Sequence, residues 1–284
     1  MPVPNELPTG RRGRHVAGDD IDPAVIYSAA AYDAQPIPTA AEAATDADPT
    51  VRRLIAAHPA LGTLPRHEHR TLLRGSRIRP LKRQELIFRQ GDAASSVALV
   101  LEGFVKLSVP LADGGELVLD IAGPGACIGE ISVLHARTRG ADAAALAPGR
   151  LLIIDARQFR QTFDRMPEGL LALLRLASRK LQRATGQLID SRARSALARL
   201  AKTVLQVARL APSDPHHPGG LGLRLSQGEW GLMAGMSREL VNKHLGVWRD
   251  AGWISLSGGT VTSVDIAALE GISGDDQDGD ADPG

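Results

Sequence analysis

The chain contains 284 residues, which at about 150 residues per domain predicts two folded units. Hydrophobic residues make up 43% of the sequence, enough to fill real cores, so a wholly disordered chain is excluded. The 33 Lys and Arg residues nearly balance the 32 Asp and Glu residues, and the net charge of +1 therefore indicates no particular partner. The single cysteine, Cys127, excludes a disulfide framework and any cluster bound by several thiolates within one chain.

No apolar run in the sequence approaches the roughly 18 residues that a membrane helix needs. The N-terminal arginines are not followed by the apolar stretch of a secretory signal. One cysteine in the whole chain fits a reducing compartment. We therefore expect a cytoplasmic protein without a membrane partner.

Both ends of the sequence lack the large apolar side chains of a core. Residues 1–50 carry seven of the 18 prolines and many small residues, so burial cannot offset the entropy of ordering them. We predict that this segment is a flexible N-terminal arm. Residues 273–284 are acidic and rich in glycine, which predicts a disordered tail.

Short runs typical of β-strands follow one another from about residue 75 to residue 155. They comprise residues 85–88, 97–101, 104–109, 116–121 and 151–154. Strands at such even spacing favour a compact antiparallel sandwich or roll, which we assign to residues 51–166. The sequence Asp113-Gly114-Gly115 is typical of a tight hairpin turn between two of these strands.

A helical period replaces the β pattern over residues 167–210. Apolar residues are spaced by 4, 3, 4, 3 and 4 positions, at Leu170, Leu174, Ala177, Leu181, Ala184 and Leu188. This seam suits a helix that pairs with the same helix of a second copy, so we expect a dimerisation helix, a hinge and a homodimer. The alternative is a helix that packs only on its own domain.

A helix-turn-helix pattern stands in the C-terminal part of the sequence. Ser226, with Glu229 three positions later, forms a capping-box start for a short helix. Gly235 falls where that helix must end and the chain must turn. Ser237 can then cap a second helix, from residue 238 to about residue 249.

Two internal positions and a hairpin agree with this motif. Gly231 and Val241 fall where a helix-turn-helix needs a small contact residue and a buried branched residue. Residues 253–264 are typical of a tight hairpin, which would form a wing. We therefore predict a winged helix-turn-helix DNA-binding domain over residues 211–272. The alternative is a helical hairpin that does not bind DNA.

The second helix carries the residues that we expect to contact DNA. They are Ser237, Arg238, Glu239, Asn242 and Lys243. Arg238 can donate two parallel hydrogen bonds to guanine O6 and N7, and Glu239 can accept one from cytosine N4. Lys243 lies about one turn further along and can reach a guanine or a phosphate.

Positive charge is concentrated upstream of this domain. Residues 211–272 contain four Lys or Arg and six Asp or Glu, whereas residues 174–210 contain nine Lys or Arg and one acidic residue, Asp190. Because DNA binding depends on neutralising phosphates, we expect some of the upstream cations to flank the duplex. The alternative is that they only solvate the long helices.

A second informative segment lies around Gly129. This glycine permits a tight turn, and the backbone amides that follow it, including that of Ile131, begin a short helix that can cradle an anion. Arg139 has a charge suited to a phosphate, and Glu130 offers an acceptor for a sugar hydroxyl. This combination suits a cyclic nucleotide. The alternative is a salt bridge between Glu130 and Arg139 that closes the loop.

The chain resembles the CRP/FNR superfamily of bacterial transcription regulators over roughly residues 65–270. The resemblance rests on Gln90-Gly91-Asp92, Glu102-Gly103, Gly129-Glu130 with Arg139, and Ser237-Arg238-Glu239 with Val241. It implies an α+β fold with an antiparallel, cyclic-nucleotide-binding-like β-roll effector domain, a long dimerisation helix and a C-terminal winged helix-turn-helix. It further implies that Glu130 contacts the ribose 2′-hydroxyl and that Arg139 contacts the cyclic phosphate.

The chain departs from the family pattern in its expected ligand site. Gly140 stands where the residue after the phosphate arginine is usually serine. The family's cyclic-AMP-dependent members hold the base with two adjacent hydroxyl residues on the dimer helix, and these positions fall at Ala184 and Thr185. Ala184 cannot bond to the adenine amino group. Thr185 can donate to guanine, with Arg183 or Gln187 nearby, so cyclic GMP is a candidate effector beside cyclic AMP.

These patterns predict a ligand-responsive, sequence-specific transcription regulator, not an enzyme. The sequence contains no nucleophile elbow, Walker loop or paired-carboxylate motif. Double-stranded DNA and a second copy are the expected partners, and RNA polymerase is a further candidate. The alternative is the same regulator with a diverged pocket, either constitutive or responsive to another ligand such as cyclic di-GMP.

Metal and cofactor sites find little support in the sequence. His67-Glu68-His69, and Asp214 with His216-His217, carry metal-capable side chains, but neither set has a further convergent ligand. The single cysteine excludes the iron–sulfur branch of the family, and His135 is a weak candidate for a haem ligand. We expect no metal and no cofactor.

Overall fold

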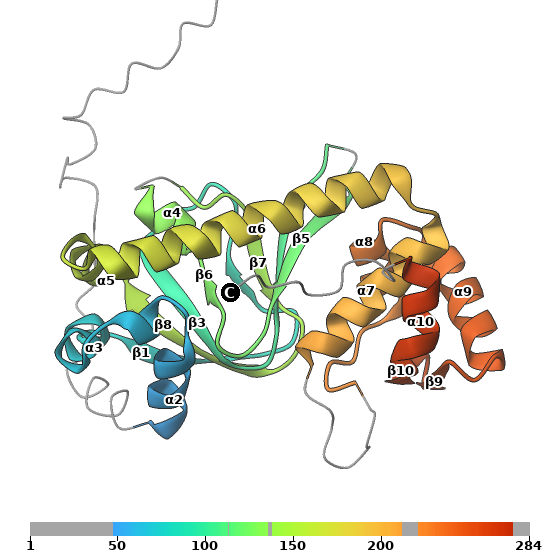
Figure 1. Cartoon of the computed structure of the whole chain (residues 1–284), viewed down its shortest axis with the longest axis horizontal. Helices are drawn as coiled ribbons and strands as arrows, with labels where there is room; N and C mark the ends of the chain where they lie inside the picture. Colours follow the sequence, from blue (N-terminus) through green and yellow to red (C-terminus); the bar gives the residue numbers. More distant parts are fainter. Residues whose placement is uncertain (1–47, 113, 136–137, 212–220, 275–284) are drawn as a thin grey trace, which may run out of the picture. The chain divides into compact units, whose positions relative to one another are not determined.

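The computed structural model describes residues 48–112, 114–135, 138–211 and 221–274 (Figure 1). Most of the predicted arm, the acidic tail beyond residue 274 and residues 212–220 lie outside the described residues. Helix α2 (Pro49–Ala57) begins inside the segment predicted as an arm, because Asp48 caps it. Helix α10 (Ile266–Ser273) extends one residue into the segment predicted as a tail.

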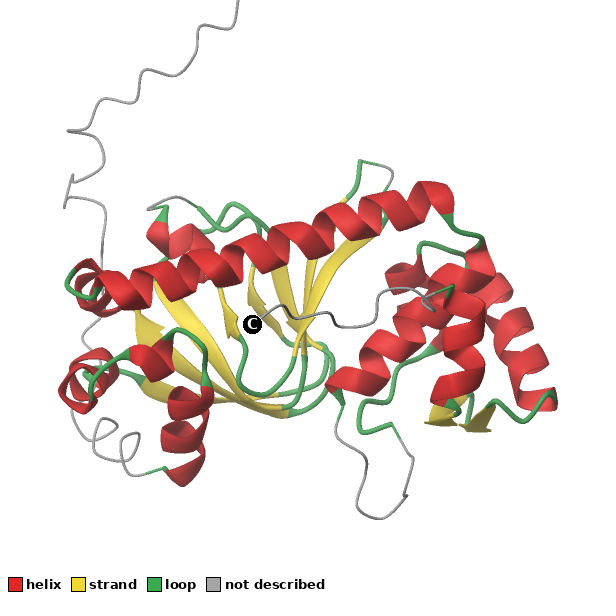
Figure 2. Cartoon of the chain, viewed as in Figure 1, coloured by secondary structure: helices red, strands yellow, loops and turns green. Residues whose placement is uncertain are grey.

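Eight strands form two four-stranded antiparallel sheets (Figure 2). The first sheet has the order β1-β8-β3-β6 and the second has the order β2-β7-β4-β5. The strands are β1 (Arg77–Leu81), β2 (Leu86–Phe88), β3 (Ser96–Glu102), β4 (Val105–Pro110), β5 (Glu116–Ala122), β6 (Cys127–Ile128), β7 (Asp142–Ala145) and β8 (Gly149–Asp155). The predicted antiparallel β-roll is confirmed, and so is the hairpin, in which β4 pairs with β5. Asp113, which was expected in its turn, lies outside the described residues.

Three strands were not predicted, because their sequences carry weak β signals. Strand β7 reads Asp-Ala-Ala-Ala, and alanine favours helix. Long-range pairing overrides this preference, since β7 bonds to β2 on one side and to β4 on the other. Strand β6 has only two residues, and β1 contains Pro80.

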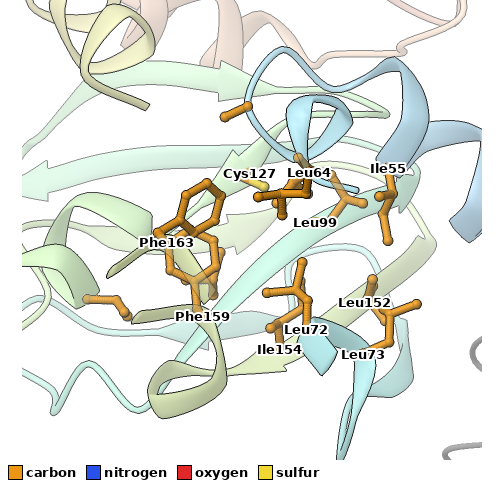
Figure 3. Packing of buried hydrophobic residues seen from close by; sticks show 14 of the residues in the cluster. Ile55, Leu64, Leu72, Leu73, Leu99, Cys127, Leu152, Ile154, Phe159 and Phe163 are labelled. Atoms are coloured by element: carbon orange, nitrogen blue, oxygen red, sulfur yellow. The ribbon is translucent and has the colours of Figure 1, made fainter. Parts of the chain in front are cut away.

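Helices cover the outer face of the first sheet with an apolar core (Figure 3). They are α2, the short helix η3 (Leu61–Thr63), α3 (Arg66–Leu73) and α5 (Ala156–Asp164). The rings of Phe159 and Phe163, both on α5, lie 4.7 Å apart and are fully buried with Leu99 and Leu152 of the sheet. This core fixes the strands that support the loop after β6.

The segment predicted as a dimerisation helix and a hinge contains two helices. Helix α6 (Pro167–Ala193) is followed by α7 (Ala196–Leu210), which Ser195 caps through its hydroxyl. Asp190 bridges the break, because its carboxylate pairs with Arg194 at 2.7 Å and with Lys202 at 2.9 Å. Among the residues that the structure places, no helix is both long and apolar enough to cross a bilayer.

The apolar seam of α6 is accessible in the single chain. Leu170, Leu174 and Leu181 are 47%, 62% and 69% exposed. Such exposed leucines at heptad spacing are typical of a helix that pairs with another helix. The side chain of Leu188 lies outside the described residues.

The C-terminal elements form the predicted winged helix-turn-helix. Helix α8 (Gln227–Ala234) and helix α9 (Arg238–Asp250) precede a hairpin of β9 (Ile254–Ser257) and β10 (Thr260–Val264). Trp230 and Trp248 are fully buried between these elements. Helix α10, which was not predicted, packs against α7.

A buried histidine makes the stability of the β-domain depend on pH. His58 follows α2, and its Nδ1 atom accepts hydrogen bonds from the amides of Ala60 and Leu61 at 3.1 and 3.0 Å. Burial lowers the pKa of His58 to about 4, and the charge of Lys180 acts in the same direction. The unfolded chain therefore takes up a proton near pH 6.5, whereas the folded chain does so only near pH 4.

We predict that this difference lowers the free energy of unfolding by about 3 kcal/mol as the pH falls from 7 to 4. The replacement His58→Asn keeps an acceptor for the two amides but cannot titrate in this range. Urea unfolding of both proteins at several pH values measures the effect. The wild type should lose more stability than His58→Asn between pH 6.5 and 4, and equal losses would contradict the assignment.

Candidate effector cavity and nucleic-acid interface

The loop after β6 turns sharply at Gly129 and continues into helix α4 (Glu130–Leu134). Gly129 has φ 79° and ψ 2°, a left-handed conformation that glycine adopts without strain. A side chain at this position would collide with the guanidinium of Arg139. The sequence therefore needs glycine here for two reasons, the turn and the close approach of Arg139.

A cavity of about 380 Å³ lies between this loop and helix α6, and we refer to it as the effector cavity. Its volume falls within the range of small-molecule sites, about 300–1,000 Å³. Five of the seven residues predicted for the ligand line it: Gly129, Glu130, Ile131, Gly140 and Ala184. Two segments that are about 50 positions apart in the sequence, and that were both predicted for the ligand, thus meet at one cavity.

The central ion pair of this cavity was missed by the sequence analysis. Lys180 of α6 lies 2.7 Å from the buried carboxylate of Glu130. Its ammonium group also donates to the carbonyl oxygen of Cys127 at 3.2 Å. Lys180 precedes Ala184 by one helical turn and so shares its face, which is the signal that could have identified it.

The side chain of Arg139 lies outside this cavity. Its guanidinium donates to the carbonyl oxygens of Ser96 at 2.7 Å and Gly129 at 3.2 Å, and it lies 4.2 Å from the ring centre of Phe88. Arg139 is only 4% exposed and does not line the effector cavity. The alternative salt bridge with Glu130 is not the arrangement found, since Lys180 is the ion-pair partner of Glu130.

The two expected base-contacting positions lie on different sides of helix α6. Ala184 lines the cavity, whereas Thr185 is exposed and does not. Thr185 lies about 100° further around the helix axis than Ala184, on the exposed side of α6. Arg183 does line the cavity, and it lies 3.5 Å from the carboxylate of Asp120. The side chain of Gln187 lies outside the described residues.

The turn of the helix-turn-helix has the geometry that its sequence predicts. The capping box of Ser226 and Glu229 is present, and Gly235 ends α8 in a left-handed conformation. A Cβ atom on Gly231 would lie 2.6 Å from the carbonyl oxygen of Met236, so only glycine allows the two helices to approach this closely. The prediction of a small contact residue is thereby explained.

The predicted DNA-contacting residues lie together on one accessible surface. Ser237, Arg238, Glu239, Asn242 and Lys243 are all exposed. Hydrogen bonds from its own backbone amide and from the Ser237 hydroxyl lower the pKa of Glu239, so this residue stays an acceptor. The amide of Gln227 donates to Asn242 at 3.1 Å and fixes its orientation. This row of donors and acceptors can read base edges in a major groove.

The wing and the upstream cations complete this part of the structure. Gly258 and Gly259 both have positive φ, at 57° and 78°, as a tight hairpin turn requires. Among the upstream cations whose side chains the structure describes, six have intramolecular ion-pair or hydrogen-bond partners: Lys180, Arg183, Arg194, Arg199, Lys202 and Arg209. These six side chains are therefore engaged within the chain itself.

The described residues contain no group of three or more His, Cys, Asp or Glu side chains that could hold a metal ion. His216 and His217 lie outside them. Cys127 is buried and free, and burial raises the pKa of its thiol, so it stays protonated.

Comparisons with known proteins match both halves of the chain. Residues 78–166 match the cyclic nucleotide-binding domain, and residues 198–272 match the Crp-like helix-turn-helix domain. The CRP-like cAMP-activated global transcriptional regulator of Mycobacterium tuberculosis is 30% identical over 187 residues, which cover 66% of this chain and 84% of the relative. The cAMP-activated global transcriptional regulator CRP of Pasteurella multocida is 28% identical and covers 62% and 84%.

A solved structure shows the same fold. FixK2 from Bradyrhizobium japonicum matches with a TM-score of 0.63 at 18% sequence identity. The match covers 69% of this chain and 96% of that protein.

The ion pair between Lys180 and Glu130 gives a direct prediction. The replacement Lys180→Ala leaves a buried carboxylate without its cation and should lower the free energy of unfolding by about 3 kcal/mol. Arg179→Ala is the matched control, because Arg179 is the exposed neighbour of Lys180 on the same helix. Denaturant unfolding compares the variants. If the pair acts as described, combining Lys180→Ala with Glu130→Gln restores part of the loss, and additive losses would argue against it.

Proposed function

The chain belongs to the CRP/FNR family of transcription regulators, and we propose that a cyclic mononucleotide, cyclic AMP or cyclic GMP, controls its binding to DNA. The family domains supply a cyclic nucleotide-binding module and a helix-turn-helix. The relatives in Mycobacterium tuberculosis and Pasteurella multocida are named as cAMP-activated regulators. In this proposal the protein binds its effector and DNA without catalysing a reaction.

One observation carries the proposal: the effector cavity is bounded by both the loop after β6 and helix α6. A ligand in this cavity touches the loop and the helix at once. Its binding energy can therefore depend on how the helix is placed, which is the requirement for a population shift. The binding energy of a ligand that touched only the loop would not depend on the placement of the helix.

The cavity residues have the chemistry for such a ligand. The Glu130 carboxylate can accept from a ribose hydroxyl, and the Lys180 ammonium beside it can donate to a second acceptor on the ligand. Arg139 can reach a cyclic phosphate once it leaves the carbonyl oxygen of Ser96. We propose that the ligand's phosphate competes for this guanidinium.

The exposed seam of α6 supports a homodimer in which two recognition helices act together. Leu170, Leu174 and Leu181 would pair with the same residues of a second copy. Two α9 helices then enter successive major grooves, about 34 Å apart on the duplex. We infer that the effector favours the arrangement with this spacing, and RNA polymerase is a candidate partner of the DNA-bound dimer.

A second candidate function rests on the placement of Arg139. This residue is turned away from the effector cavity, and Gly140 supplies no hydroxyl. Both features suit a regulator whose cavity has diverged and which is constitutive or responds to another ligand, such as cyclic di-GMP. Calorimetry with cyclic AMP, cyclic GMP and cyclic di-GMP, followed by operator titrations with each, distinguishes the two candidates. Operator binding that none of the three changes would overturn the first.

Ala184 offers a test of the cavity that does not remove any existing contact. The replacement Ala184→Thr adds a hydroxyl at a position that lines the cavity, and we expect the affinity for cyclic AMP to rise roughly fivefold through one new hydrogen bond. Ala184→Val has the same shape without the hydroxyl and serves as the control. Calorimetry measures both, and an equal effect of the two replacements would contradict a base contact at this position.

Arg238 tests the assignment of α9 as the recognition helix. The replacement Arg238→Ala should cost roughly 1–3 kcal/mol of operator affinity and relax specificity at one base position. Arg249→Ala, at the other end of the same helix, should leave specificity unchanged. Binding to a library of single-base operator variants measures both. A uniform loss over all sequences would assign Arg238 to a phosphate instead.

A further inference from the structure

The β-domain contains a second cavity, of about 240 Å³, which Arg139 lines. Phe88 lines both this cavity and the effector cavity, so the two are neighbours. The volume is below the range of about 300–1,000 Å³ for sites of drug-sized molecules, and it suits a smaller ligand.

Strand β1 contributes two arginines to this cavity. Arg77 and Arg79 alternate along the strand and therefore point to the same side of the sheet. Arg79 lies 2.7 Å from the carboxylate of Glu85 and is oriented by it. Arg77 is exposed and forms no ion pair with any residue that the structure describes. Its guanidinium donors are therefore available to a ligand.

Arg139 adds a third guanidinium to the wall of the cavity. Its position is fixed by the carbonyl oxygens of Gly129 and Ser96 and by the ring of Phe88. The hydroxyl-bearing residues Ser95 and Ser96 also line the cavity. The lining contains one carboxylate, that of Asp92, which accepts a hydrogen bond from the amide of Arg89 at 2.8 Å.

We propose that this second cavity binds a small dianion of the phosphate or dicarboxylate class. Three guanidinium groups against one carboxylate give the lining an excess of positive charge, and guanidinium forks match phosphate and carboxylate oxygens. The alternating arginines of β1 have no role in the apolar core of the roll. The bound anion would hold Arg139 where the structure places it.

A regulatory consequence follows, and it rests on the proposed function. Arg139 cannot serve an anion in the second cavity and the phosphate of a nucleotide in the effector cavity at the same time. The two ligands therefore oppose each other, and each lowers the affinity for the other by the same factor.

Calorimetry of the full chain with inorganic phosphate tests the site without any nucleotide, at constant ionic strength set with chloride. We expect saturable binding that Arg77→Ala weakens about tenfold or more. Arg74→Ala is the matched control, because Arg74 is exposed on the preceding segment and does not line the cavity. Succinate, titrated in the same way, distinguishes the carboxylate source from the phosphate source. Absence of saturable binding of both probes, or equal binding by Arg77→Ala and the wild type, would overturn the proposal.

The opposition is measured by titrating cyclic AMP and cyclic GMP at increasing phosphate concentration. The apparent Kd of the nucleotide should rise with phosphate in the wild type and stay constant in Arg77→Ala. A nucleotide affinity that does not change with phosphate concentration would contradict the proposal that the two ligands weaken each other's binding. If neither nucleotide binds at any phosphate concentration, the proposed function fails while the result with phosphate alone still decides the anion site.

Discussion

The ion pair between Lys180 and Glu130 is the contact on which the proposed mechanism depends. It joins a long helix to a loop that is about 50 positions away in the sequence, and both groups are largely removed from water. In such surroundings a carboxylate without its cation is costly, so the loop and the helix are held together whether or not a ligand is present. Any effector that bonds to Glu130 must share that carboxylate with Lys180. Binding of the effector therefore changes a contact of helix α6.

Local signals in the sequence predicted most of the fold and part of the site. Capping residues and glycines, such as Ser226 and Gly235, act within a few positions, so the helix-turn-helix could be placed closely. Strand β7 could not, because its alanines prefer helix and only pairing with β2 and β4 makes them a strand. A hinge was predicted within residues 167–210, but its position between α6 and α7, where Ser195 caps α7, was not.

In the ligand site, too, local sequence signals were predictive, whereas contacts made by the fold were not. Residue types near Gly129 predicted a cradle for an anion, and these residues line the effector cavity. The direction of the Arg139 side chain was not predictable, because it depends on the carbonyl oxygen of Ser96, which the fold brings in from β3. Lys180 was overlooked because a lysine on a long helix looks like any solvated cation until its partner is known.

The break between α6 and α7 has a mechanical consequence. A short break between two helices can act as a flexible hinge. Here the carboxylate of Asp190, near the end of α6, forms ion pairs with Arg194 at the break and with Lys202 of α7. These ion pairs restrain the angle between the two helices, so a rotation of α6 would be passed on to α7 in part through Lys202. Arg199 of α7 continues the linkage, because it donates to the carbonyl oxygen of Ala234, at the end of the first helix of the DNA-reading pair.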